Sequence, residues 1–274
     1  MRDIKNLGVL QGELLVFGGP YSNLQALEAL KVVAEEKGIS SDRIICTGDI
    51  LGYCAQPNEA IEFIRDWGIH GIAGNVELQV RNDEDACGCN FEEGSRCDLF
   101  SKSWYPYVQQ TIKQVNKEWL YELPEFAAFE YAGKAVFVLH GGLTDTSQFV
   151  FKSTPWDTKK EIIEEVNEDV VIAGHCGLPF NSTQNGKHWL NPGVIGMPAN
   201  DGTSRVWYMT LNDEDGVFSF EHHALEYDYQ KAAELMKEKQ LPASYAETLS
   251  NGIWDNMEIL NEEERQKQGV RIDF

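Results

Sequence analysis

Residues 44–77, IICTGDILGYCAQPNEAIEFIRDWGIHGIAGNVE, contain a strand, an acidic loop, a helix, a second strand and a second polar loop. The apolar run at its start suits a buried parallel strand, and Asp49 follows the end of that strand. Apolar side chains at helical spacing begin after Pro57 and stop at Gly68. Because open α/β sheets carry their chemistry at the carboxyl ends of strands, Asp49 and Asn75 are expected to meet at one edge.

The composition of the 274 residues is typical of a globular protein, with 42% hydrophobic and 24% charged residues. The net charge of -21 argues against a nucleic acid or an anionic membrane as a partner. No apolar run reaches the length of a membrane span, and the N-terminal residues lack the pattern of a signal peptide. Six cysteines in a chain of this size do not form a disulfide framework, so we expect a cytoplasmic protein.

The rest of the chain alternates strands and helices and predicts one domain over residues 1–274. Strands are expected at 14–17, 126–131, 135–139, 170–173, 205–211 and 217–221, and helices at 22–38, 101–121 and 156–167. Residues 82–98 are acidic and rich in glycine and cysteine, which predicts a mobile insertion. Residues 227–274 are expected to form a helical C-terminal extension.

Four of the predicted strand ends deliver a ligand-type side chain beside a glycine. These side chains are Asp49, Asn75, His140 and His175. One carboxylate, one amide oxygen and two imidazoles suit a borderline divalent transition metal such as Mn, Fe or Zn. A single histidine at a strand end is usually structural, whereas four residues in the same local pattern favour a metal site.

The same motifs resemble those of the calcineurin-like metallophosphoesterases, in the branch of small bacterial phosphodiesterases and phosphatases. The Gly-Asp, Gly-Asn, His-Gly and Gly-His pairs that contain the four residues follow the family order. Further matches lie at 52–60, 178–180, 191–198 and 241–252. The resemblance implies an α/β fold, a four-layer αββα sandwich of two mixed β-sheets flanked by helices, with a two-metal site at the strand ends.

The sequence departs from the family pattern at the positions that hold one of the two metals. Gly19 and Tyr21 stand where the first motif has an aspartate and a histidine, and Gly177 replaces the second histidine of the last motif. Val76 stands where the family has a proton-donating or phosphate-binding histidine, so no catalytic acid is identified. The resemblance therefore implies one intact metal site, at Asp49, Asn75, His140 and His175, and no second metal.

Two hypotheses about function follow from this half-site. The first is a metal-dependent hydrolase that uses one divalent metal and acts on a small-molecule phosphate ester. Its activity would be weak or altered. The loss of general acid catalysis alone typically costs about 10²–10⁴-fold in rate. The alternative is an inactive family member that binds a phosphorylated small molecule or a protein partner. A weaker third hypothesis is a two-histidine, one-carboxylate iron site.

Several cysteines lie beside the motif loops. Cys54 and Cys176 are expected to flank the site, where a thiolate would be a soft ligand or a nucleophile, although small packing residues are the commoner case. Cys87, Cys89 and Cys97 would suit zinc together with a fourth donor. Their spacing lacks a paired C-x-x-C motif, so unpaired surface thiols are the simpler prediction.

Overall fold

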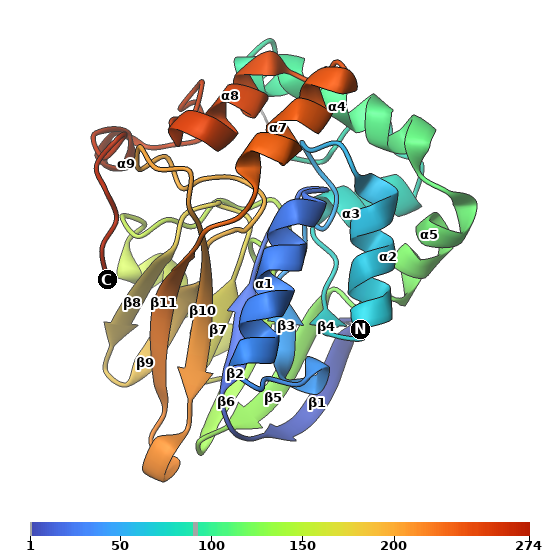
Figure 1. The fold of residues 1–274 in the computed structure, drawn as a ribbon. Helices are drawn as coiled ribbons and strands as arrows, with labels where there is room; N and C mark the ends of the chain where they lie inside the picture. The colour runs from blue at the N-terminus through green and yellow to red at the C-terminus, as the bar shows by residue number, and fades with distance from the viewer. Residues whose placement is uncertain (1, 90–92) are drawn as a thin grey trace.

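The computed structural model describes residues 2–89 and 93–274, with the side chain of Cys97 excepted. Within these residues the chain forms two mixed sheets (Figure 1). The strands of the larger sheet, in spatial order, are β1 (Ile4–Leu10), β5 (Phe126–Tyr131), β6 (Lys134–Leu139), β7 (Val170–Ala173), β9 (Lys187–Asn191) and β8 (Phe180–Gln184). Those of the smaller sheet are β11 (Ser219–Leu225), β10 (Val206–Asn212), β2 (Leu14–Phe17), β3 (Ile44–Cys46) and β4 (His70–Gly71).

Helices cover the outer faces of both sheets, which confirms the four-layer αββα architecture. The helices are α1 (Leu24–Glu36), α2 (Pro57–Trp67), α3 (Asn75–Arg81), α4 (Arg96–Thr111), α5 (Gln114–Trp119), α6 (Trp156–Val166), α7 (Tyr229–Glu238), α8 (Ala243–Asn251) and α9 (Glu262–Arg265). Figure 1 shows α4, α7 and α8 together beyond one end of the sheets. No helix in the described ranges is long and apolar enough to cross a membrane.

Three apolar clusters hold the layers together. The central cluster lies between the sheets and joins Val16 and Ile45 of the smaller sheet to Val138 and Ile172 of the larger one. A second cluster packs the smaller sheet against α1, α2 and α7, and a third packs the larger sheet against α6. Since strands β2, β3 and β7 are buried on both faces, their sequences are continuous runs of apolar residues.

The structure corrects several element predictions. Strand β1 and the β8–β9 hairpin were not expected, because β1 is largely exposed and β8 is polar after Phe180. Helix α4 begins at Arg96 and not at Ser101, and the extended residue Ile112 separates it from α5. Residues 90–92 of the expected insertion lie outside the described residues.

Candidate metal centre

Four buried side chains from different strand ends converge on one point. Asp49 follows β3, Asn75 follows β4, His140 follows β6 and His175 follows β7. Nε2 of His140 lies 3.1 Å from Oδ2 of Asp49, 3.1 Å from Oδ1 of Asn75 and 3.2 Å from Nδ1 of His175. The ligand-type atoms of Asp49, His140 and His175 all lie within 4.8 Å of one another. The predicted residues are therefore brought together.

The orientation of His140 and the neutral state of His175 suit a metal ion. Nδ1 of His140 lies 2.7 Å from the carbonyl oxygen of Thr47 and donates to it, so Nε2 faces the other donors. Burial opposes charge on His140, but the Asp49 carboxylate raises its pKa. Burial and the neighbouring His140 lower the pKa of His175 to about 3, so this imidazole is neutral. Four atoms with lone pairs converge here, and a single proton cannot bind all of them, whereas one divalent cation can.

The amide of Asn75 is oriented by the segment that follows α3. Its Nδ2 donates to the carbonyl oxygen of Cys87 at 2.9 Å and to Sγ of Cys89 at 3.2 Å. Since the amide nitrogen is held there, Oδ1 turns toward His140. This contact turns the oxygen end of the amide, which is the end that binds metal ions, toward the other ligands.

Backbone conformations with positive φ place two of the four residues. Asp49 has φ 55° and His175 has φ 61°, which is a sparsely populated region for residues other than glycine. Gly74 permits the close approach of the loops, because a Cβ at this position would lie 2.3 Å from Oδ1 of Asp49. A glycine is therefore required at position 74 because the site leaves no space for a side chain there.

Glu77 is a site residue that the motif analysis missed. Its side chain is fully buried at the third position of α3. Oε2 accepts from the amides of Asp49 at 2.8 Å and Gly74 at 2.9 Å, and Oε1 accepts from the amide of Leu51 at 2.9 Å. Burial, followed by the Asp49 carboxylate, raises the pKa of Glu77 to about 7. The available signal was a glutamate three residues after Gly74, as in a capping box.

Apolar side chains pack against Gly19 and Gly177, two positions at which the family resemblance predicts missing metal ligands. A Cβ at Gly19 would lie 2.6 Å from Cζ of Tyr21 and 2.6 Å from Cγ1 of Val194. A Cβ at Gly177 would lie 3.4 Å from the ring of Trp254. An aspartate at position 19 has no room unless Tyr21 moves, so the substitutions at these two positions are sterically linked.

The Gly19→Ala substitution is expected to lower the free energy of unfolding by about 3 kcal/mol, because it combines a positive φ of 42° with overpacking against Tyr21. Urea denaturation measures this loss. The matched control is Gly133→Ala, at φ 70° with no described atom within 4 Å, which should cost only about 1 kcal/mol. Equal losses for the two variants would show that the space around Gly19 is not filled.

The cysteines lie in two different environments. Cys176 lines the cavity beside the centre, whereas Cys54 is buried against the carbonyl oxygen of Gly196. Burial raises the pKa of each of these thiols to about 12, which keeps them neutral. Cys87 and Cys89 are buried, so the prediction of surface thiols is wrong for them. The sulfur of Cys97 lies outside the described atoms, and the three-thiol zinc hypothesis stays a prediction.

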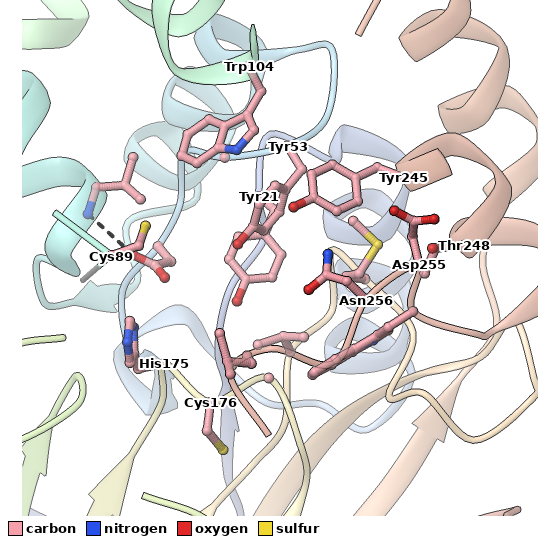
Figure 2. A pocket seen from close by; sticks show the side chains of 18 of the residues that line it. Tyr21, Tyr53, Cys89, Trp104, His175, Cys176, Tyr245, Thr248, Asp255 and Asn256 are labelled. Carbon is pink, nitrogen blue, oxygen red and sulfur yellow. Dashed lines mark hydrogen bonds between the residues drawn. The ribbon is translucent and has the colours of Figure 1, made fainter. Parts of the chain in front are cut away.

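An aromatic cavity opens beside the four donors. Figure 2 shows His175, Cys89 and Cys176 at one end and Thr248, Asp255 and Asn256 at the other, with aromatic side chains between them. The aromatic residues include Tyr53 from the loop after β3, Trp104 from α4 and Tyr245 from α8. Sequence reasoning did not identify these three residues, because they come from segments that are distant in the chain.

Comparison with known proteins supplies independent findings. A model of the calcineurin-like phosphoesterase superfamily domain matches residues 23–214. An uncharacterised protein of Methanocaldococcus jannaschii is 28% identical over 263 residues, which cover 89% of this chain and 100% of that protein.

Two solved structures share the fold. A hypothetical protein from Pyrococcus horikoshii has a TM-score of 0.74 at 18% identity, over 88% of this chain and 99% of its own. A metallophosphoesterase from Sphaerobacter thermophilus has a TM-score of 0.66 at 19% identity, over 89% of this chain and 100% of its own.

Proposed function

Because the chain belongs to the calcineurin-like phosphoesterase superfamily, we propose that it is a phosphoester hydrolase that works with one divalent transition metal ion. The observation that carries the proposal is the convergence of three donor atoms on Nε2 of His140, at 3.1–3.2 Å. Asp49, Asn75, His140 and His175 would hold the ion, and Mn, Fe and Zn suit this donor set. When bound, such an ion acidifies a water molecule and polarises a phosphoryl oxygen.

The residues around the ligands would keep the centre in one geometry. The carbonyl oxygen of Thr47 fixes the tautomer of His140, and Glu77 holds the backbone on both sides of Asp49. Val76 cannot donate a proton, so the leaving group must be protonated by solvent or be a weak base. This constraint supports a substrate with a good leaving group and a modest turnover rate.

The protein is expected to bind about one equivalent of metal per chain, because Gly19, Tyr21 and Gly177 stand at the family positions of the second metal's ligands and leave Asp49 as its one remaining ligand. Mass spectrometry of metal content, after incubation with Mn, Fe or Zn and removal of excess ion, measures the stoichiometry. Two tightly bound equivalents would contradict the one-metal proposal. The absence of any specific metal would contradict a metal-dependent activity altogether.

Hydrolysis tests the reaction itself. The metal-loaded protein should release 4-nitrophenol from 4-nitrophenyl phosphate or its diester, and a chelator should stop the release. Metal loading without turnover of any phosphate ester would contradict the hydrolase proposal and would favour a binding protein. A requirement for oxygen with ferrous iron would instead support the iron-site hypothesis.

A further inference from the structure

Tyr21 and Gly177, which stand at two of the expected ligand positions, line the aromatic cavity. Tyr53 stands at its centre, with its ring 4.8 Å from that of Tyr21, 5.0 Å from Trp104 and 4.8 Å from Tyr245, all edge to face. Figure 2 shows Tyr21 and Tyr53 between His175 and Asn256, with Trp104 and Tyr245 above them. Such a set of rings presents flat apolar surface and ring edges to a ligand.

The charges of the cavity exclude an anionic group from its aromatic part. In the described lining, the charged side chains are the carboxylates of Asp49 and Asp255, without lysine or arginine. Asp255 accepts from Arg96 Nε at 2.8 Å, and this ion pair joins the C-terminal segment to α4 at the rim. A phosphoryl group would therefore go to the metal centre, and the aromatic part would take an uncharged group.

A buried nitrogen atom of the lining lacks a hydrogen-bond partner in the described part of the chain. Nε1 of Trp104 has no hydrogen bond to any described residue, although the side chain is fully buried. Buried polar atoms are nearly always paired in native proteins, so an unpaired N–H group in a cavity indicates a ligand or water. The indole N–H of Trp104 requires an acceptor.

Part of the cavity wall comes from residues after the range that the family model matches. Tyr245, Trp254 and Ile259 lie after residue 214, where the match to the model ends. Nε1 of Trp254 donates to the carbonyl oxygen of Pro198 at 2.7 Å, which fixes the indole beside Gly177. The C-terminal residues thus close the side of the site that the lost metal leaves open.

We propose that this cavity binds the organic part of the phosphate ester, a planar aromatic ring that carries a hydrogen-bond acceptor. The ring lies against the wall formed by Tyr53, Trp104 and Tyr245, its acceptor meets the indole N–H of Trp104, and its phosphoryl group reaches the metal centre. Nucleobases and substituted aryl groups share this chemistry. The inference rests on the proposed function, since it identifies the substrate class of the same site.

Calorimetry on the full-length, metal-loaded protein tests the proposal. The probes are adenosine 5′-phosphate, 4-nitrophenyl phosphate and glycerol 3-phosphate, which share a phosphoryl group and differ in the organic part. At least one aromatic ester should bind about tenfold or more tightly than glycerol 3-phosphate, as expected for stacking on aromatic side chains. Tighter binding of the nucleotide would identify a nucleobase, and tighter binding of the nitrophenyl ester would identify an aryl group.

Variants link this preference to the cavity. Tyr245→Ala should lower the aromatic-to-glycerol affinity ratio by about tenfold, while Tyr121→Ala, at an exposed tyrosine outside the cavity, should leave it unchanged. Trp104→Phe keeps a ring, removes the N–H donor and should weaken the aromatic esters by about threefold to tenfold. Circular dichroism checks that each variant folds.

The outcomes separate this inference from the proposed reaction. Adenosine, which lacks a phosphoryl group, should bind the metal-free protein and should bind Tyr245→Ala less tightly, even if no ester is hydrolysed. Equal affinities for all three esters, or equal effects of Tyr245→Ala and Tyr121→Ala, would overturn the aromatic subsite while leaving a hydrolase in place. If adenosine bound but the protein took up no metal and hydrolysed no ester, the proposed reaction would be overturned and the subsite would be supported.

Discussion

The His140→Ala substitution is expected to abolish specific metal binding and to lower metal-dependent phosphoester hydrolysis by at least about 100-fold. Nε2 of His140 is the atom around which the donors of Asp49, Asn75 and His175 gather. Loss of a residue that merely supports a metal ligand typically costs 10–100-fold in affinity or activity. Loss of the central donor should therefore cost more.

Metal content and initial rates of 4-nitrophenyl ester hydrolysis, measured on the same preparations, check this result. The matched control is His188→Ala, because His188 is half-buried in β9 and lies within hydrogen-bond distance of Thr183. The control should keep about one equivalent of metal and the activity of the unmodified protein. If His140→Ala retained metal and activity, the four-residue centre would be wrong.

The Glu77→Ala substitution should give the second large effect, a loss of about 4 kcal/mol in the free energy of unfolding. It leaves the backbone amides of Asp49, Leu51 and Gly74 without their acceptor inside the protein. Each unpaired buried donor costs about 1–3 kcal/mol, and water entering the space left by the side chain offsets part of the sum. Metal affinity should also fall, since Asp49 loses its support.

Urea denaturation and metal titration measure the two consequences of Glu77→Ala. Glu264→Ala is the matched control, because Glu264 is also a buried glutamate but accepts from one backbone amide, that of Ser153. Its loss of stability should be smaller, at about 1–3 kcal/mol, without a change in metal affinity. A Glu77→Ala variant as stable as the Glu264→Ala variant would show that the three amide contacts add little.

The expectation that the site residues meet came from local patterns. An apolar run followed by one ligand-type side chain next to a glycine recurs at Asp49, Asn75, His140 and His175, and parallel strands bring their carboxyl ends together. Elements with weak local patterns escaped prediction. Strand β1 is an exposed edge strand, and β8 is polar. Both strands form because they pair with neighbouring strands, and their sequences carry no clear periodicity.

The sequence by itself determined the alternation of strands and helices and the four ligand-type side chains at strand ends, because strand runs, glycines and ligand side chains are local features of the chain. The four-layer arrangement was expected from the family resemblance of the motifs. Only the tertiary structure revealed that Glu77 supports Asp49, that Cys87 and Cys89 are buried beside Asn75, and that Tyr21 fills the space next to Gly19. It also revealed the aromatic cavity, whose walls include residues 53, 104 and 245. Packing and burial depend on contacts between distant segments, and no local pattern encodes which of those contacts form.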